Sequence, residues 1–326
     1  MIALAQEHPL TVDHLANDLL AALGPDAVHR NRSLARHTLL HVGGPADLLV
    51  LAETVEVLRR AVSLAWQHQV PCRVLGAGAN VLVSDAGVRG LVVLNRARPI
   101  SFLSRREHGG SGAGSVVQAE SGATFSVVAR QCVQRGLAGL EWAASIPGTV
   151  GGAVVGNAGA WGGDVASTLL RAVILEPGGL VVDRPVEWFE YGYRTSLLKR
   201  RASPGASQAV VLEAEFSVQP GDRLVLKARV AEMAARRKAS QPPGASCGSV
   251  FKNPPGDYAG RLIEAVGLKG QRQGEAEISA LHANFIVNHG TATAADVQAL
   301  IDLARQTVQA RFGVTLEPEI ELVGDW

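Results

Sequence analysis

The chain has 326 residues, 47% hydrophobic and 19% charged, and its 31 Lys and Arg against 30 Asp and Glu leave a net charge of +1. This composition excludes an intrinsically disordered chain, and the length predicts two or three domains. The near-neutral charge and 5% aromatic content also disfavour a nucleic-acid-binding protein.

The three cysteines, Cys72, Cys132 and Cys247, form no CxxC pair. We therefore expect no metal site and a reducing compartment. The first ten residues lack the basic start and apolar run of a signal peptide, and no segment is apolar enough to span a membrane. These features predict a cytoplasmic protein.

The first third of the chain alternates helical and strand patterns. Residues 1–35 are expected to form a helical lead-in, in which Leu15, Leu19 and Leu23 provide an apolar face. A helix capped by Thr54 is expected to continue to Gln69. Strands are expected at 47–52, 72–76, 80–84 and 90–95. Together these elements predict a small α/β unit.

The middle of the chain is rich in strand and turn signals. The stretch 107–115 predicts a hairpin turn or a domain boundary because four of its nine residues are glycine and two are serine. A helix is expected from Thr124 to a stop at Gly136, and a hairpin turn at Pro177–Gly179. Strands are expected at 116–120, 172–176, 180–183 and 209–218.

The last third begins with a predicted hinge at Gln219–Asp222 and a basic helix from Arg223 to Lys238. Thr293 and Asp296 form a capping-box pattern that starts a second helix, expected to end at Gly313. Short strands are expected at 284–288 and 317–323.

Two glycine-rich segments are candidate ligand-binding loops. The loop Gly76–Asn80 lies between two expected strands, where its N–H groups can form an anion-binding nest; a tight β-turn is the alternative. It is no Rossmann fingerprint, because no helix follows. Residues 145–163 hold seven glycines in nineteen residues, which we interpret as backbone pressed against a flat or phosphorylated ligand rather than an ordinary packed element. A glycine-rich structural loop is the alternative.

Three polar clusters could carry chemistry. Arg194, among tyrosines and hydroxyls in 191–196, can clamp a carboxylate or phosphate, or be a surface arginine. Ser249 can cap a turn or deliver a proton, and the absence of a G-x-S-x-G elbow excludes a hydrolase nucleophile. Glu317, Glu319 and Glu321 would share one face of a strand and could act together there. The alternative is that this face is simply exposed to solvent.

In their joint order, these segments resemble the MurB family, the UDP-N-acetylenolpyruvoylglucosamine reductases, along nearly the whole chain. The matching blocks are Thr38–Ala46, Gly76–Asn80, Gly139–Glu141, Ile146–Gly163, Tyr193–Ser196, Gly248–Pro254, Ala259–Glu264, His282–Asn288 and Leu316–Glu319. The resemblance implies an α+β fold, with a two-part FAD-binding region of the vanillyl-alcohol-oxidase/PCMH type followed by an α/β substrate-binding domain. The implied divisions are 1–98, 99–221 and 222–326.

The resemblance also implies the roles of individual residues. The family's catalytic arginine falls on Arg194, its proton-donating serine on Ser249 and its catalytic glutamate on Glu319. Its flavin-binding segments fall on Gly76, Ala77, Gly78, Ala79, Asn80, Val81, Leu82, Ile146, Pro147, Gly148, Thr149, Gly151, Gly152, Ala153 and Asn157. Its substrate-holding residues fall on Tyr193, Arg237, Lys238, Lys252, Asn253, His282 and Asn284.

The activity implied is the reduction of UDP-N-acetylglucosamine enolpyruvate through non-covalently bound FAD, with NADPH as reductant, in peptidoglycan precursor synthesis. No nucleic acid, membrane or obligate protein partner is expected. Ala79 departs from the serine usual in the family's loop, and the short connection from Arg194 to Val211 is typical of members without an extra substrate-covering loop. Two alternatives are another PCMH-type FAD oxidoreductase and a flavin-binding protein that has lost catalysis. The blocks Gly248–Pro254 and Leu316–Glu319 disfavour the first, and the joint presence of Arg194, Ser249 and Glu319 disfavours the second.

Overall fold

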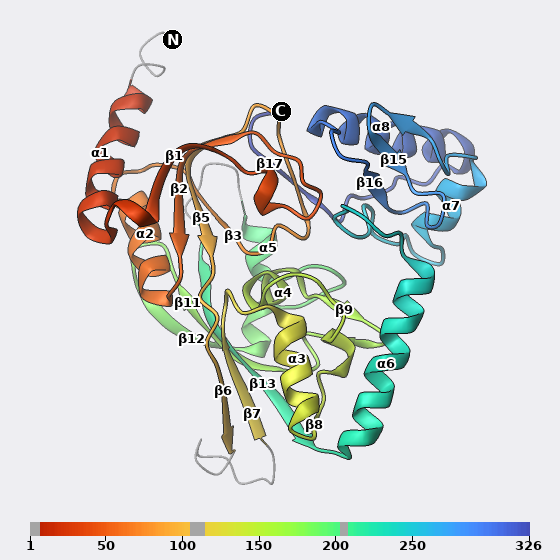
Figure 1. Cartoon of the computed structure of the whole chain (residues 1–326), viewed down its shortest axis with the longest axis horizontal. Coiled ribbons are helices and arrows are strands. Elements are labelled where there is room, and N and C mark those ends of the chain that lie inside the picture. Colours follow the sequence, from red (N-terminus) through yellow and green to blue (C-terminus); the bar gives the residue numbers. More distant parts are fainter. Residues whose placement is uncertain (1–6, 105–114, 203–207) are drawn as a thin grey trace. The chain divides into compact units, whose positions relative to one another are not determined.

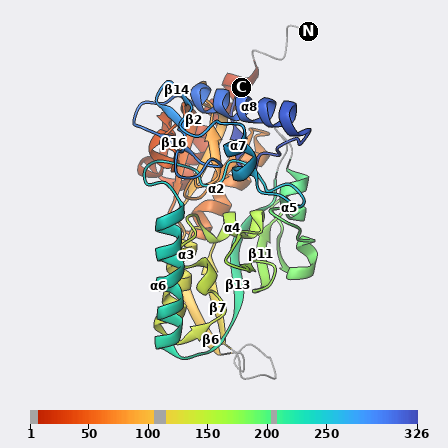
Figure 2. The same cartoon turned by 90° about the vertical axis from the view of Figure 1, so that its right-hand side faces the viewer.

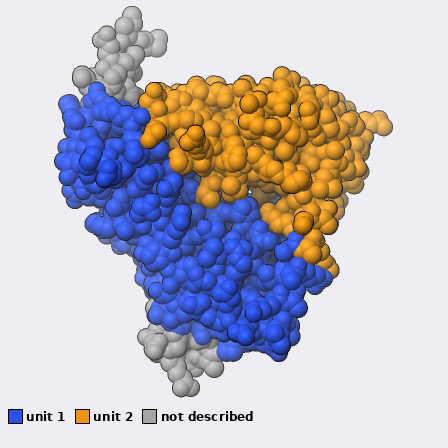
Figure 3. All heavy atoms as spheres, viewed as in Figure 1, with its two compact units in different colours: residues 1–30, 47–76, 90–234 blue, residues 31–46, 77–89, 235–326 orange. Residues whose placement is uncertain are grey.

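The structure is a computed structural model that describes residues 7–104, 115–202 and 208–326. The chain divides into two compact units (Figure 3). Unit 1 comprises Met1–Arg30, Asp47–Gly76 and Gly90–Ala234, and unit 2 comprises Asn31–Ala46, Ala77–Arg89 and Ala235–Trp326. The three-part division at 98 and 221 stays a prediction. No helix among the described residues combines the length and apolar character needed to cross a membrane.

The N-terminal helix α1, Glu7–Leu23, is shorter than the predicted lead-in. It ends at Gly24, whose φ of 84° no helix can continue, and Pro25 follows. The expectation of helix to residue 35 is wrong, because β1, Val28–Ser33, comes next. Most of β1 is exposed and polar, so no apolar pattern marked it as a strand.

The first sheet has the strand order β1-β2-β5-β3 (Figure 1), with β2 at Pro45–Ala52, β5 at Val88–Asn95 and β3 at Cys72–Leu75. Helix α2, Val55–Gln67, starts as predicted, because the Thr54 hydroxyl accepts from the Val57 N–H at 3.2 Å. The apolar faces of α1 and α2 share one buried core with β2 and β5. The strand predicted at 80–84 forms as β4, Val81–Val83, but it lies outside this sheet and pairs with β17 instead.

The second sheet is antiparallel, with the order β12-β11-β13-β7-β6. Its strands are β6 at Ile100–Ser104, β7 at Ser115–Glu120, β11 at Leu169–Leu175, β12 at Val181–Pro185 and β13 at Val210–Pro220, and β8 at Leu137–Ala138 pairs with β13. The predicted hairpin at Pro177–Gly179 is confirmed by the β11–β12 pairing. The turn predicted at 107–115 lies outside the described residues except for Ser115.

Helices α3, Phe125–Gln134, and α4, Val150–Gly156, cover one face of this sheet (Figures 1 and 2). The expectation that the glycine-rich segment builds no packed element is wrong, because α4 buries Val150 and Val154 in the core. A Cβ on Gly151 would lie 3.0 Å from the Cβ of Ser121, so glycine lets the helix approach closely. The rest of the segment forms the short strands β9, Gly159–Ala160, and β10, Gly163–Asp164.

Helix α6 runs from Arg223 to Ser240, close to the predicted range. In unit 2, α7 and α8 pack on a sheet of order β14-β15-β16. The bounds are Ala259–Ala265 for α7, Ala294–Phe312 for α8, Arg272–Gln273 for β14, Ala276–Ile278 for β15 and Ile286–Asn288 for β16. The predicted capping box of Thr293 and Asp296 and the stop at Gly313 are both confirmed.

The predicted strand at 317–323 forms in two pieces. Strand β17 is only Glu321–Val323, paired in parallel with β4. Residues Glu317 and Glu319 instead bond the extended segment at 250–252, through Lys252 N–H to the Glu317 carbonyl at 2.9 Å and Glu319 N–H to the Val250 carbonyl at 2.8 Å. Pro318 has no N–H to continue a ladder. The remaining short helices are α5, Leu197–Arg201, and four 3₁₀ turns at Pro25–Ala27, Ala35–His37, Glu141–Ala143 and Val186–Phe189.

Candidate active site

Arg194 lies at the tip of a tight turn in unit 1. Gly192 and Thr195 close this turn through two backbone hydrogen bonds, at 3.1 and 3.2 Å. The Arg194 Nη2 donates to the Gly159 carbonyl at 2.6 Å, and Nη1 donates to the Asn157 carbonyl at 3.4 Å. The guanidinium also lies 5.4 Å from the centre of the Tyr193 ring. The cation is therefore oriented by fixed backbone dipoles, as expected of a group that stabilises negative charge.

The two ends of this turn are held on the C-terminal end of α4. The Tyr191 hydroxyl donates to the Val154 carbonyl at 2.9 Å, and the Ser196 hydroxyl donates to the Val155 carbonyl at 2.6 Å. Burial raises the pKa of Tyr191, so its hydroxyl remains a donor at every physiological pH. The last carbonyls of α4 have no hydrogen-bond partner within the helix. They instead accept from the two ends of the turn and so fix the position of Arg194.

Backbone strain concentrates at the same place. Seven non-glycine residues of the described chain have positive φ, and four of them are Asn157, Trp161, Glu190 and Arg194. Each such residue costs on the order of 1 kcal/mol, so the surrounding structure must over-determine it. Strain of this kind is typical of functional sites.

The two glycine-rich segments predicted to bind flavin meet at Gly76 and Thr149 in unit 1. A Cβ on Gly76 would lie 2.2 Å from the Thr149 Oγ1, so only glycine permits this approach. Thr149 itself is buried and forms an isolated bridge with Thr124. The structure therefore brings Gly76 and Thr149 together, although they lie 73 positions apart in the sequence.

The loop after Gly76 has the character of an anion-binding nest. Within the described residues, the N–H groups of Ala77, Gly78, Ala79 and Asn80 find no acceptor. Successive unpaired N–H groups suit the oxygens of a phosphate or pyrophosphate. The residues present therefore fit the diphosphate of a dinucleotide cofactor such as FAD. Val81 and Leu82 follow as buried residues of β4.

The other predicted flavin contacts surround Thr149. Gly148 accepts a hydrogen bond from the Phe125 N–H at 3.0 Å, and the Gly151 N–H donates to the Ser121 carbonyl at 2.8 Å. Ala153 is buried in the core, whereas Ile146 packs against it and Pro147 is exposed. Gly152 has only the Thr149 hydroxyl near its Cβ position, at 3.7 Å.

Ser249 and Glu319 lie on neighbouring segments of unit 2. Ser249 forms an isolated bridge with Phe285, and the next residue, Val250, accepts from the Glu319 N–H at 2.8 Å. Ser249 is half-buried, and its hydroxyl has no hydrogen-bond partner in the described chain. Because it has no partner there, the serine hydroxyl remains available to donate a proton. Burial, reinforced by the Glu319 carboxylate, raises the pKa of nearby Cys247 to about 12.

Glu319 is also tied to the predicted flavin loop. The Asn80 Nδ2 donates to the Glu319 carbonyl at 3.0 Å, and the Glu321 N–H donates to the Asn80 carbonyl at 3.0 Å. This pairing spans 239 positions along the chain. Asn80 therefore couples the position of a candidate catalytic carboxylate to that of the loop.

Several predicted substrate residues already use their polar groups within unit 2. Lys252 Nζ pairs with the Glu317 carboxylate at 2.5 Å, and the Asn253 Oδ1 accepts from the Ala259 N–H at 3.1 Å at the start of α7. The Asn284 side chain bonds both the N–H and the carbonyl of Phe251, at 2.9 and 2.8 Å. These bonds shape the segment that carries Ser249.

The remaining predicted substrate residues are more open. His282 packs against Phe285 with ring centres 4.8 Å apart, and burial lowers its pKa, which favours the neutral ring. Partial burial likewise lowers the pKa of Arg237, while Lys238 and Tyr193 are exposed. Their role in holding substrate stays a prediction.

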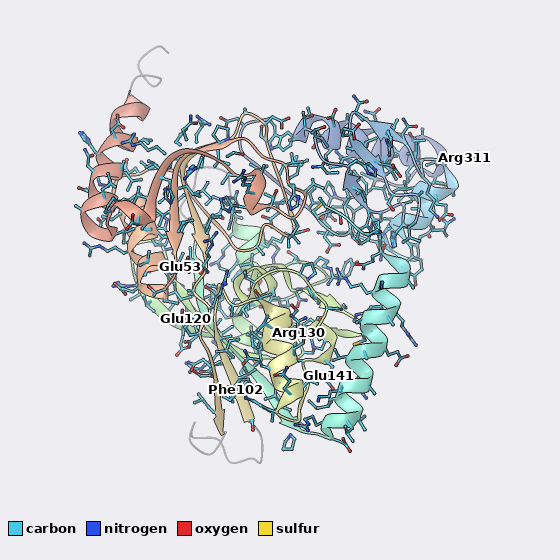
Figure 4. All side chains as sticks on the ribbon, viewed as in Figure 1. Glu53, Phe102, Glu120, Arg130, Glu141 and Arg311 are labelled. Atoms are coloured by element: carbon cyan, nitrogen blue, oxygen red, sulfur yellow. The ribbon has the colours of Figure 1, made fainter. Side chains whose placement is uncertain are left out.

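Sequence reasoning assigned no role to two charged residues near the glycine-rich segment, the exposed Arg130 and the buried Glu141 (Figure 4). Arg130 donates from α3 to the Ala144 carbonyl at 3.0 Å, just before Ile146. Glu141 is 6% exposed, accepts from the Gly139 N–H at 2.6 Å and pairs with Arg229 at 3.3 Å. It lines a cavity of about 490 Å³ in unit 1. Of Arg130 and Glu141, only Glu141 lies in a segment that the sequence analysis singled out as a family motif, Gly139–Glu141.

Two family profiles match this chain. The family profile described as FAD binding domain matches residues 46–183. The profile described as UDP-N-acetylenolpyruvoylglucosamine reductase, C-terminal domain, matches residues 239–323. The first profile includes both glycine-rich segments, and the second includes Ser249 and Glu319.

The chain is also similar over nearly its whole length to proteins named UDP-N-acetylenolpyruvoylglucosamine reductase. The chain is 44% identical over 299 residues to the UDP-N-acetylenolpyruvoylglucosamine reductase of Chloroflexus aggregans, covering 92% of this chain and 98% of that protein. It is 46% identical over 292 residues to the protein of the same name from Rubrobacter xylanophilus, covering 90% and 94%. The crystal structure of MurB from Thermus caldophilus matches with a TM-score of 0.73 and 36% identity, covering 91% of this chain and 98% of that chain.

These matches confirm the predicted α+β fold with an FAD-binding region. They extend over nine-tenths of the chain at identities well above those that fold similarity alone would give. The chain belongs to the UDP-N-acetylenolpyruvoylglucosamine reductase (MurB) family.

Proposed function

We propose that this chain reduces UDP-N-acetylglucosamine enolpyruvate to UDP-N-acetylmuramate in peptidoglycan precursor synthesis, with FAD as its cofactor and NADPH as its reductant. The observation that carries this proposal is the 44% identity to a UDP-N-acetylenolpyruvoylglucosamine reductase over 92% of the chain. The substrate is a small nucleotide sugar. A cytoplasmic location and independence of protein partners stay predictions.

The unpaired N–H groups of Ala77–Asn80 and the close approach of Gly76 to Thr149 support FAD binding by these two segments. When bound, FAD supplies the redox chemistry, in which hydride taken from NADPH passes to the β-carbon of the enol ether. The chain's own task is to hold the substrate, to stabilise the charge that develops and to deliver one proton.

Arg194 is proposed to stabilise that charge. Hydride addition at the β-carbon leaves negative charge on the α-carbon, which spreads into the adjoining carboxylate. A guanidinium already aligned by the Gly159 and Asn157 carbonyls needs little reorganisation as this charge appears. Electrostatic stabilisation of this kind is usually the largest single contribution to catalysis.

Ser249 is proposed to protonate the α-carbon, and Glu319 to orient the substrate carboxylate. Serine is a weak acid in water, but the carbanion is a strong base, and positioning lowers the barrier further. The pairing of Glu319 N–H with the Val250 carbonyl keeps both residues on one framework.

Product analysis tests this proposal against its alternatives. The FAD-loaded chain is incubated anaerobically with NADPH and the enolpyruvyl nucleotide, and the products are separated and weighed by mass spectrometry. The proposal predicts UDP-N-acetylmuramate in a one-to-one ratio with the NADPH consumed. Bound FAD without product would indicate a flavin-binding protein that has lost catalysis. Flavin reduced by a hydroxy acid or sugar, but not reoxidised by the nucleotide, would indicate another oxidoreductase.

A further inference from the structure

The side chain of Asn157 faces the arginine turn. Its Nδ2 donates to the Gly192 carbonyl at 2.9 Å, and its Oδ1 accepts from the Ala166 N–H at 3.0 Å. The residue is 5% exposed. Because the amide is engaged at both ends with protein backbone, it is poorly placed to serve as a ligand contact, the role expected from the sequence.

The main chain of Asn157 serves the same turn. The residue ends α4 in the left-handed conformation, with φ 46° and ψ 57°, which asparagine tolerates better than most residues. In this conformation its carbonyl accepts from the Arg194 Nη1 at 3.4 Å, and the Gly159 carbonyl, two residues on, accepts from Nη2 at 2.6 Å. Asn157 therefore contacts the turn through its side chain and the guanidinium through its backbone.

Asn157 attaches the turn to the end of α4 at Gly192, whose carbonyl also accepts from the Thr195 N–H within the turn. Tyr191 and Ser196 secure its two ends on the Val154 and Val155 carbonyls. The Nδ2 of Asn157 secures Gly192, directly before the tip residues Tyr193 and Arg194. Arg194 has a φ of 55°, so the tip is strained and needs such support.

We infer that Asn157 is a positioning residue for Arg194: it holds the arginine turn and the guanidinium in the geometry that receives the substrate carboxylate, rather than binding the flavin. This inference rests on the proposed function for the role of Arg194, and on the contacts above for the role of Asn157. A positioning residue should affect the step that uses Arg194 and spare the step that does not.

Two variants separate the contacts. Asn157→Gly removes the side chain while keeping the left-handed backbone. Asn157→Asp keeps an acceptor for the Ala166 N–H but replaces the donor to Gly192 with a negatively charged carboxylate oxygen, which repels the Gly192 carbonyl. Gln69→Gly is the matched control, because Gln69 also has positive φ, 55°, and lies just beyond α2.

The half-reactions of the FAD-loaded protein are then measured one at a time. We expect both Asn157 variants to slow reoxidation by the enolpyruvyl nucleotide by about 10- to 100-fold, as small misplacements of a catalytic group do. The rate of flavin reduction by NADPH and the FAD dissociation constant should stay as in the unaltered chain and in Gln69→Gly. Weaker FAD binding or slower NADPH oxidation in the Asn157 variants would overturn the inference, as would no effect at all.

A double-mutant cycle with Arg194→Ala tests whether Asn157 acts through the arginine. Once the guanidinium is absent, Asn157→Gly should cause little further loss in reoxidation. Additive losses would show that Asn157 acts by another route.

Amide hydrogen exchange across residues 191–196 is a readout that does not depend on turnover. Exchange at these amides should rise in Asn157→Gly and Asn157→Asp and stay unchanged in Gln69→Gly. If the unaltered chain cannot be reoxidised by the nucleotide, the proposed function fails, whereas the exchange result still decides whether Asn157 holds the turn. Unchanged exchange in both variants would overturn the inference by itself.

Discussion

Gly76→Ala tests whether the close contact between the two flavin segments matters. An alanine Cβ at this position would lie 2.2 Å from the Thr149 Oγ1 and 2.8 Å from its Cγ2. Gly76 is not among the residues with positive φ, so alanine meets no backbone penalty there. The cost therefore comes from the contact alone.

The magnitude follows from how little Thr149 can move. Its neighbours are held by the Phe125 N–H on the Gly148 carbonyl and the Val150 N–H on the Ala123 carbonyl, at 3.0 and 2.9 Å. Overpacking at such a site costs about 1–3 kcal/mol. If the loop gives way instead, the same free energy corresponds to FAD binding that is weaker by about 5- to 150-fold.

Urea unfolding of the FAD-free chain and fluorescence titration with FAD measure the two costs. Adding Thr149→Ala removes Oγ1 and Cγ2, so the double variant should recover most of the loss. Gly156→Ala is the control within α4, because its Cβ would meet nothing within 4 Å, and we expect it to be neutral or slightly stabilising. A Gly76→Ala chain with unaltered stability and unaltered FAD affinity would refute the reasoning.

Three further predictions concern the chemistry and the titrating groups. Ser249→Ala and Arg194→Ala should each slow reoxidation by the enolpyruvyl nucleotide by about 100-fold or more in stopped-flow measurements, while flavin reduction by NADPH stays nearly unchanged; equal loss in both half-reactions would contradict these roles. Burial raises the pKa of Cys132 and Cys247 to about 12, so a thiol reagent at about pH 8 should label these two thiols only after unfolding; rapid labelling of either thiol in the folded chain would contradict this. Burial lowers the pKa of His282 from 6.5, so the unfolded chain gains a proton there before the folded chain does as pH falls. Acidification below about 6.5 should therefore lower the free energy of unfolding less in His282→Gln than in the unaltered chain. Identical pH slopes in urea unfolding of the two chains would exclude this contribution.

Local signals predicted the elements that depend on few residues. Helix α8 was predictable because Thr293 and Asp296 form its capping box and Gly313 ends it in the left-handed conformation. Thr54 likewise marked the start of α2. In each case the determinants lie within one or two helical turns of the boundary.

Non-local pairing escaped prediction. Strand β4 reads as part of the first sheet, yet its partner is β17, near the other end of the chain. Strand β1 is mostly exposed, so no alternation of apolar residues revealed it. The sequence holds the apolar pattern of a strand but not the identity of its neighbour.

The candidate site shows a similar limit. The positions of Arg194, Ser249 and Glu319 followed from the family resemblance, whereas the partners of Asn157 and Asn284 did not. Both asparagines were expected to contact ligands, and both use their amides on backbone groups of the protein. A polar residue type predicts a hydrogen bond, but the partner depends on the packed structure.

The most direct test of the proposed reduction follows the visible absorbance of the flavin through both half-reactions without oxygen. The chain is loaded with FAD, titrated with NADPH, and then mixed with UDP-N-acetylglucosamine enolpyruvate. The account predicts that NADPH bleaches the flavin band and that the nucleotide restores it. A flavin that NADPH reduces but the nucleotide cannot reoxidise, or a chain that cannot be loaded with FAD, would contradict the account.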